Sequence, residues 1–149
     1  MDTITLPANY GLVLVVACSS FFVNTYHVLL TSKFRKASGL VYPAPYASNE
    51  QAEKDPKAYA FNCAQRAHSN FTENHPSSMG AMLIAGLKYP QAAAMVGTGW
   101  VVARIIYAAG YTSGAGPKGR SVGSGISFLT DFIMKGMAAY TAVTMVMES

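Results

Sequence analysis

The sequence predicts an all-α integral membrane protein, a four-helix bundle formed by one domain over residues 1–149. The first observation is composition, because 51% of the residues are hydrophobic and only 12% are charged, about half the charged share of a soluble domain. The second is length, since the chain has room for four segments of roughly 20 residues, the length that crosses a bilayer. The third is that such segments lie near residues 10–31, 59–87, 91–111 and 126–147.

Residues 10–31, "YGLVLVVACSSFFVNTYHVLLT", form the clearest predicted span, because they contain no Lys, Arg, Asp or Glu. No basic cluster precedes this segment and no small-residue cleavage site follows it, so we expect it to be retained rather than removed as a signal peptide. The next residues carry a basic cluster and the prolines Pro43 and Pro45. They predict a loop that starts at the membrane interface.

The three later helices are less uniform. Residues 59–87 are polar in their first half and apolar in their second, and Pro76 lies inside them, which membrane helices tolerate. Residues 91–111 are apolar apart from one arginine and two tyrosines, and the glycine-rich "TSGAGPKGRSVGSG" after them predicts a turn. In residues 126–147 the charged side chains are Asp131 and Lys135, whose i, i+4 spacing predicts an ion pair within the helix.

Lysine and arginine are distributed unevenly over the predicted loops. Seven of them lie on the first and third loops, whereas the second loop has only Lys88. Because cytosolic loops carry the excess of positive charge, we expect the first and third loops in the cytosol and both termini across the membrane. The same asymmetry accounts for the net charge of +4, so no nucleic-acid partner is predicted.

Polar side chains form one stripe on each of the two central helices. Arg66, Asn70 and Glu73 stand at i, i+4 and i+7, so they lie along one face of the second helix. Arg104, Tyr107 and Tyr111 stand at i, i+3 and i+7 on the third. Neighbouring antiparallel helices can bring the two stripes face to face.

Ionisable groups at membrane depth are costly and usually face a bundle interior or a ligand. Arginine forks suit a carboxylate, and a glutamate beside them suits an ammonium group, so the stripes predict a site for a zwitterionic, peptide-like ligand. The alternative is that Arg66, Glu73 and Arg104 only pair with one another and hold the bundle together. His27 and His75 are expected at the membrane interfaces and have no partners at metal-ligand spacing, so no metal site is predicted.

Two motifs on separate helices, "FNCAQRAHSNFTENHP" and "VARIIYAAGYTSG", with "SKFRKASGLVYPAPY" before them, resemble the membrane-associated proteins in eicosanoid and glutathione metabolism, the MAPEG family. Within that family the sequence is most similar to the microsomal glutathione S-transferases of the third type. The similarity runs from about residue 10 to residue 127 and preserves the order and spacing of both motifs.

The resemblance implies a homotrimer of four-helix subunits that binds glutathione between adjacent subunits near the cytosolic side. By motif position, the glutathione ligands are Arg66, Asn70, Glu73, Tyr107 and Tyr111. Two further candidates come from outside the stripes. His68 points away from its helix's stripe and can face a neighbouring chain, and Arg35 can reach the site from a neighbouring subunit.

The resemblance also implies that a fixed cation holds glutathione as its thiolate, the nucleophilic form of a thiol. Leukotriene C4 synthase, a family member, uses an arginine shortly after the third helix. The matching position here is Lys118, with Arg120 two residues on. Lys118 is favoured by position and Arg120 by its permanent charge, and Arg104 is the rival. The same relative has a tyrosine where this chain has Asn74, which removes one expected hydrogen bond to the ligand.

The function implied is that of a membrane-bound, glutathione-dependent transferase or peroxidase. Its second substrates are lipophilic electrophiles or lipid hydroperoxides that enter from the bilayer, in the endoplasmic reticulum or the mitochondrial outer membrane. Glutathione serves as co-substrate and no metal is expected. The alternative is a non-catalytic lipid-binding or scaffold protein of the same fold. A small channel is disfavoured, because the polar residues gather on one side and form no continuous path.

Overall fold

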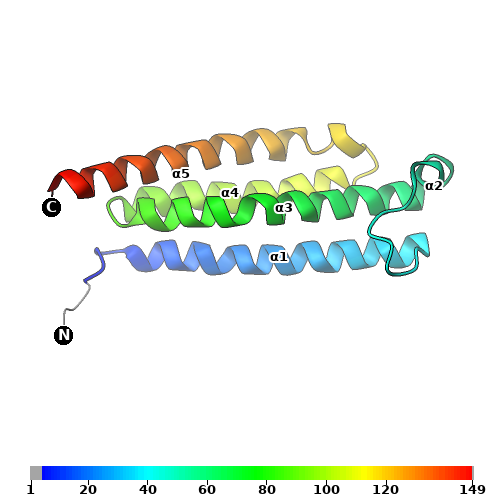
Figure 1. Ribbon diagram of the computed structural model, residues 1–149, viewed down its shortest axis with the longest axis horizontal. Coiled ribbons are helices and arrows are strands. Elements are labelled where there is room, and N and C mark those ends of the chain that lie inside the picture. The colour runs from blue at the N-terminus through cyan, green and yellow to red at the C-terminus, as the bar shows by residue number, and fades with distance from the viewer. Residues whose placement is uncertain (1–4, 149) are drawn as a thin grey trace.

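The computed structural model describes residues 5–148 and shows a bundle of four long helices that run alternately in opposite directions (Figure 1). This arrangement confirms the predicted all-α, four-helix architecture. The long helices are α1 (Tyr10–Ser38), α3 (Pro56–Gly86), α4 (Pro90–Tyr111) and α5 (Ser121–Glu148). A short helix α2 (Asn49–Lys54) precedes α3, and a 3-10 turn η1 (Gly116–Lys118) lies between α4 and α5.

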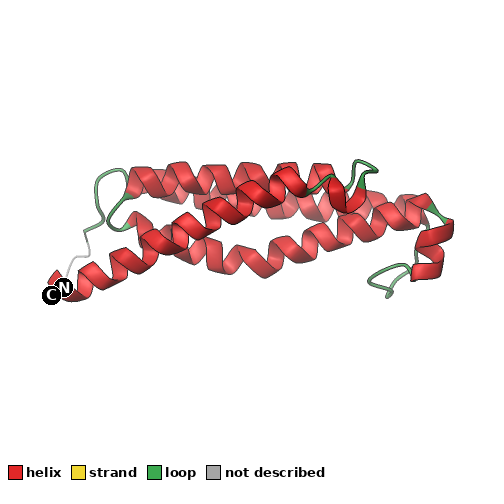
Figure 2. Ribbon diagram, turned by 90° about the horizontal axis from the view of Figure 1, so that it is seen from above, coloured by secondary structure: helices red, strands yellow, loops and turns green. Residues whose placement is uncertain are grey.

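Helices α3 and α4 form the middle of the bundle. Helix α1 packs against both of them from one side and α5 packs against both from the other (Figure 1). The start of α1 and the end of α5 lie at one end of the bundle, and α2 and the α4–α5 connection lie at the opposite end (Figures 1 and 2). The end that carries α2 is called the α2 end below.

Two helices differ in extent from the predicted ranges. Helix α1 continues beyond Thr31 to Ser38, and therefore includes the basic cluster that was expected in a loop. Helix α5 begins at Ser121, inside the glycine-rich segment that was expected to be a turn throughout. Helix α3 begins after Asp55, whose side chain accepts a hydrogen bond from the backbone N–H of Lys57 (2.9 Å) and caps the helix.

The outward faces of α1 and α5 are apolar. Phe22 on α1 is 76% exposed and Phe128 on α5 is 75% exposed, and many other large hydrophobic side chains accompany them. Such a surface is typical of a protein surrounded by lipid or by other subunits. Among the described residues, α1 and α4 are long and apolar enough to cross a membrane. Helices α3 and α5, which carry more polar side chains, do not reach the same hydropathy.

The bundle interior contains two apolar clusters. The larger one joins all four long helices and includes Val13, Phe71, Trp100 and Met134. The smaller one lies nearer the α2 end, where Tyr107 and Tyr111 pack with small residues of α3 and α4. The polar stripes of α3 and α4 meet beside this second cluster.

Candidate functional site

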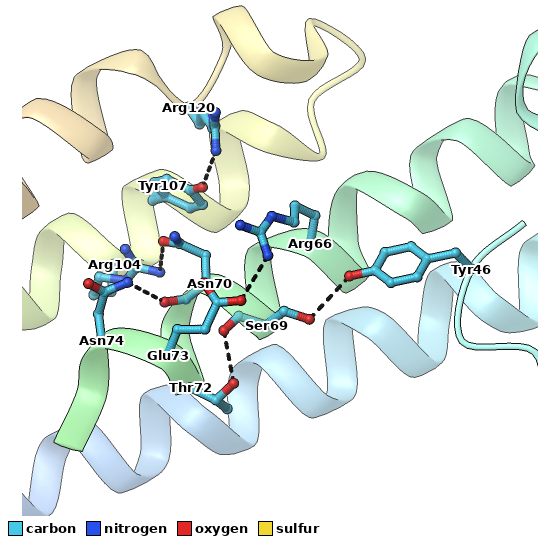
Figure 3. Close-up of polar contacts among 10 residues, drawn as sticks. All are labelled: Tyr46, Arg66, Ser69, Asn70, Thr72, Glu73, Asn74, Arg104, Tyr107 and Arg120. Carbon is cyan, nitrogen blue, oxygen red and sulfur yellow. Dashed lines mark hydrogen bonds and ion pairs between the residues drawn. The ribbon is translucent and has the colours of Figure 1, made fainter. Parts of the chain in front are cut away.

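Arg66 and Glu73 on α3 form the most accessible part of the site. The Arg66 Nη1 atom lies 2.8 Å from the Glu73 Oε1 atom, across two turns of the same helix (Figure 3). Both side chains are about half exposed. Their ion pair joins no two helices, so it contributes little to holding the bundle together, and both charges remain open to a ligand.

Asn70 and Arg104 connect α3 to α4. The Arg104 Nη2 atom donates to the Asn70 Oδ1 atom at 2.9 Å (Figure 3). Arg104 is 3% exposed, and its guanidinium carbon lies 4.5 Å from the centre of the Tyr107 ring. Asn74, which stands where leukotriene C4 synthase has a tyrosine, donates to the backbone carbonyl of Asn70 (2.8 Å). Arg104 therefore pairs with a neutral amide rather than with Glu73.

Arg120 lies over the two tyrosines of α4. Its Nη1 atom donates to the Tyr107 hydroxyl at 2.6 Å, and its guanidinium carbon lies 4.9 Å from the centre of the Tyr111 ring. The hydrogen bond to Tyr107 raises the pKa of the Arg120 guanidinium still further above neutrality. Arg120 is half-buried. It therefore presents a permanent positive charge beside a phenol hydroxyl, the combination that stabilises a thiolate.

Close backbone contacts place Arg120 there. A Cβ atom on Gly119 would lie 2.0 Å from the Gly110 carbonyl oxygen, and one on Gly123 would lie 2.3 Å from the Tyr107 backbone nitrogen. Only glycine allows such approaches. Gly119 and Gly123 thus allow the α4–α5 connection to pack closely on α4, and Arg120 lies between them in the sequence.

Three candidate residues lie apart from this cluster. His68 faces α1, where its Nε2 atom is 3.2 Å from the Asn24 Oδ1 atom, so its partner is in the same chain. Arg35 donates to the Ala44 carbonyl (2.9 Å) and lies over the rings of Tyr42 and Phe61 at the α2 end. The third, Lys118, is exposed on η1.

Two contacts have no counterpart in the sequence analysis. Tyr46, from the loop before α2, lies with its hydroxyl 3.2 Å from the Ser69 hydroxyl on α3, next to the stripe (Figure 3). The predicted pair of Asp131 and Lys135 is confirmed at 2.5 Å, but Asp131 also accepts a hydrogen bond from Ser78 on α3 (2.6 Å).

Within residues 5–148, no three His, Cys, Asp or Glu side chains gather as a metal site would require.

Comparison with known protein families matches residues 13–140 to the MAPEG family. The chain belongs to this family. The match extends from α1 into α5 and so includes parts of all four long helices, and the family assignment inferred from the two motifs is confirmed. MAPEG proteins are membrane proteins, and the family includes glutathione-dependent transferases and peroxidases and enzymes similar to leukotriene C4 synthase. The charges and hydrogen-bonding groups of the site in this MAPEG protein are therefore compared with those of glutathione.

Proposed function

We propose that this MAPEG protein is a membrane-bound glutathione transferase or peroxidase that acts on lipophilic electrophiles or lipid hydroperoxides. The observation that supports it is a cluster of charged and polar groups at one level of α3, α4 and the α4–α5 connection (Figure 3). It is called the polar cluster below. Its residues are Arg66, Asn70, Glu73, Arg104, Tyr107, Tyr111 and Arg120.

The charges of the polar cluster suit the charges of glutathione, which has two carboxylates and one ammonium group. Arg66 is the donor for a carboxylate and Glu73 the acceptor for the ammonium group, and both are half exposed. Because their present partner is each other, a ligand can replace that contact without opening the bundle. This argues against the alternative that the charges serve only to join helices.

Arg120 is the group that favours the thiolate. It is fixed by its hydrogen bond to Tyr107 and stays charged where an ammonium group can lose its proton. The thiolate sulfur then attacks an electrophilic carbon and forms a C–S bond, and the electron pair of the broken bond moves to the leaving group. With a hydroperoxide, the sulfur attacks the distal oxygen and forms an S–O bond, while the proximal oxygen leaves with the electron pair of the O–O bond and takes up a proton to become the alcohol. A second glutathione then converts the resulting sulfenic acid to glutathione disulfide and water. Arg104 acts as a positioning residue, since it holds Asn70 and packs on Tyr107.

The remaining parts of the proposal concern the assembly and the location. We infer a homotrimer with four spans in each subunit, a site shared between subunits to which a neighbour's Arg35 contributes, and the third type of microsomal glutathione S-transferase as the subtype. His68, which faces α1 of its own chain, is not included in this site. The exposed apolar faces of α1 and α5 support burial in lipid or against other subunits. The endoplasmic reticulum and the mitochondrial outer membrane are the proposed locations.

The decisive experiment is a titration of the detergent-purified protein with glutathione, followed by the ultraviolet absorbance of the thiolate. An enzyme should show a saturable thiolate signal at neutral pH, where the thiol group of free glutathione is almost wholly protonated. Arg120→Gln should remove the signal. Saturable binding of a lipid with no thiolate signal in the wild-type protein would instead identify the non-catalytic lipid-binding alternative.

A further inference from the structure

A cavity of about 200 Å³ lies between α3, α4 and α5, beside the polar cluster. Asn70 and Arg104 belong to both, and the cavity continues from them to Trp100 on α4 and Ser127 on α5. Most of its accessible lining is polar. A polar cavity within a bundle that has apolar outer faces needs a physical reason, because buried polar groups are costly unless they are paired.

Two buried side chains in the cavity wall carry unpaired polar atoms. Arg104 is 3% exposed and Ser127 is 6% exposed. Neither the Arg104 Nε atom nor the Ser127 Oγ atom has a hydrogen-bond partner within the described part of the chain. Because most buried polar atoms in proteins are paired, the two atoms indicate a ligand that accepts hydrogen bonds.

The charges in the wall indicate that this ligand is an anion. Among the described residues, the Arg104 guanidinium donates only to the neutral amide of Asn70. Asp131 also lines the cavity, but its carboxylate is engaged by Lys135 and by the Ser78 hydroxyl. The net charge of the wall is therefore positive, and it comes from Arg104.

The arrangement of the free donors favours a small, spherical anion. One donor is the N–H group of Arg104 Nε on α4 and the other is the hydroxyl of Ser127 on α5, whereas the Arg104 Nη2 atom is already bonded to Asn70. A carboxylate gains most from the two parallel N–H groups of a free guanidinium fork. A halide ion accepts hydrogen bonds from any direction, so single donors on different helices suit it.

The cavity has room for such an ion and a polar route to it. A volume of about 200 Å³ holds a halide with several water molecules, since one water takes about 30 Å³ in the liquid. A second, open pocket at the α4–α5 connection includes Arg120 and shares Ser124 and Phe128 with the cavity. The positive charge of Arg120 at this entrance raises the local concentration of anions.

We propose that the cavity is a halide-binding site, occupied by chloride in the cell, with Arg104 and Ser127 as its donors. The inference goes beyond the proposed function, since the halide is neither glutathione nor its second substrate. Bound chloride gives the buried Arg104 an anionic partner. Because Arg66 is paired with Glu73, Arg120 then remains as the positive charge of the polar cluster that is free to stabilise a thiolate.

Bromide and Trp100 supply the signal for the test. Trp100 is the only tryptophan in the sequence, lines the cavity and is 4% exposed. Bromide is a heavy halide that quenches tryptophan fluorescence on contact. Sodium bromide replaces sodium sulfate at constant ionic strength in samples of the detergent-solubilised full chain. Quenching should saturate, and added chloride should relieve it. Sulfate should not relieve it, because a double charge costs more to dehydrate.

Three variants and one control locate the bromide. Arg104→Gln should weaken saturable quenching about tenfold or more, because it removes a charge-assisted hydrogen bond, and Ser127→Ala should weaken it by a smaller factor. Asp131→Asn should strengthen it, because a negative charge leaves the wall while Lys135 remains. Lys54→Gln is the control, since it removes an exposed positive charge far from the cavity, and quenching should not change.

The opposite effects of Ser127→Ala and Asp131→Asn test the proposal even if Arg104→Gln fails to fold. No change in either variant would overturn it. Quenching that rises linearly with bromide and is not relieved by chloride would also overturn it, because it would be collisional.

Glutathione provides a second arm of the experiment. Saturating glutathione should leave the bromide quenching intact, since Arg66 is its carboxylate donor in the proposed function. Displacement of bromide would mean that the cavity receives a glutathione carboxylate, and the halide proposal would be wrong. The thiolate absorbance of the same samples reports the proposed function separately. A thiolate signal without saturable quenching would reject the halide site and leave the glutathione chemistry standing.

Discussion

Arg66 and Glu73 differ from the other residues of the polar cluster because each is half exposed and they form an ion pair within one helix. We expect Arg66→Ala to weaken glutathione binding more than tenfold, because it removes a charge-assisted hydrogen bond of roughly 1.5–3 kcal/mol. Calorimetric titration of the folded, detergent-solubilised variant measures the effect. Arg66→Lys should restore only part of the affinity, since an ammonium group cannot form the two-pronged contact.

The matched control for Arg66 is Lys54, which forms an exposed ion pair with Glu50 at the α2 end. Lys54→Ala removes one positive charge from the same end of the bundle, but from outside the polar cluster. Its glutathione affinity should stay within a factor of about two of wild type, since exposed ion pairs contribute little. Equal losses of glutathione affinity in the two variants would show that Arg66 acts only through the net positive charge of the α2 end.

Arg120 and Lys118 are two residues apart but differ in surroundings. Arg120 donates to the Tyr107 hydroxyl, whereas Lys118 is exposed. We expect Arg120→Ala to lower kcat about a hundredfold or more while the affinity for glutathione changes little, because removal of one such electrostatic donor has effects of that size. Lys118→Ala should keep nearly full turnover. Stopped-flow conjugation at saturating glutathione separates kcat from binding.

Arg104→Ala completes this comparison. Because Arg104 holds Asn70 and packs on Tyr107, its loss should affect glutathione affinity and kcat together, unlike the loss of Arg120. Full turnover in both the Arg120 and Lys118 variants would show that the α4–α5 connection does not stabilise the thiolate. The cation beside the sulfur would then come from the helices of the same subunit or from Arg35 of a neighbouring subunit.

The positions of the candidate residues were predictable where helical spacing alone decides which face of the helix their side chains share. The i, i+4, i+7 pattern placed Arg66, Asn70 and Glu73 on one face, and two of them do bond to each other. The choice between Lys118 and Arg120 was not predictable, because it depends on how an irregular connection folds back onto α4. Nor did any spacing indicate that His68 meets Asn24 or that Tyr46 meets Ser69, since those partners lie on other segments.

At the scale of elements, the first turn of α5 decides where Arg120 lies. Gly123 faces the α4 backbone at Tyr107, whereas an added Cβ at Gly125 would meet nothing within 4 Å. Gly123→Ala should therefore push α5 from α4, at a cost of about 1–3 kcal/mol, and lower both Tm and conjugation rate. Gly125→Ala is the control from the same helix. It should leave the rate unchanged and stabilise by roughly 0.5–1 kcal/mol.

The contact between Gly123 and α4 also explains why the predicted range of α5 was too short. Glycine-rich stretches favour turns in isolation, but here the small residues permit a helix–helix contact that larger ones would prevent. The context of α4 thus overrides the local preference of residues 121–125. If Gly123→Ala and Gly125→Ala unfold at the same temperature and react at the same rate, the close contact does not position Arg120.

On the scale of the whole molecule, the two ends of the bundle differ in charge. The α2 end combines the basic last turns of α1 with Lys54, Lys57 and the α4–α5 connection, whereas the other end holds Lys88, which pairs with Glu148 at 2.8 Å. The polar cluster lies towards the basic end. A cytosolic α2 end would therefore place the candidate site where water-soluble glutathione is supplied, while lipid substrates reach the same level from the bilayer.

We predict that the α2 end is cytosolic, because positively charged loops remain on that side. Single cysteines at Ser113 in the α4–α5 connection and at Gln91 near Lys88 test this in a background without Cys18 and Cys63, with an impermeant thiol reagent on sealed microsomes whose outer face is cytosolic. Both positions are exposed. The cysteine at Ser113 should react in intact vesicles, and the one at Gln91 only after permeabilisation. Equal reaction before permeabilisation would put both positions on the same face, which contradicts the orientation and the single crossing by α4 that separates them.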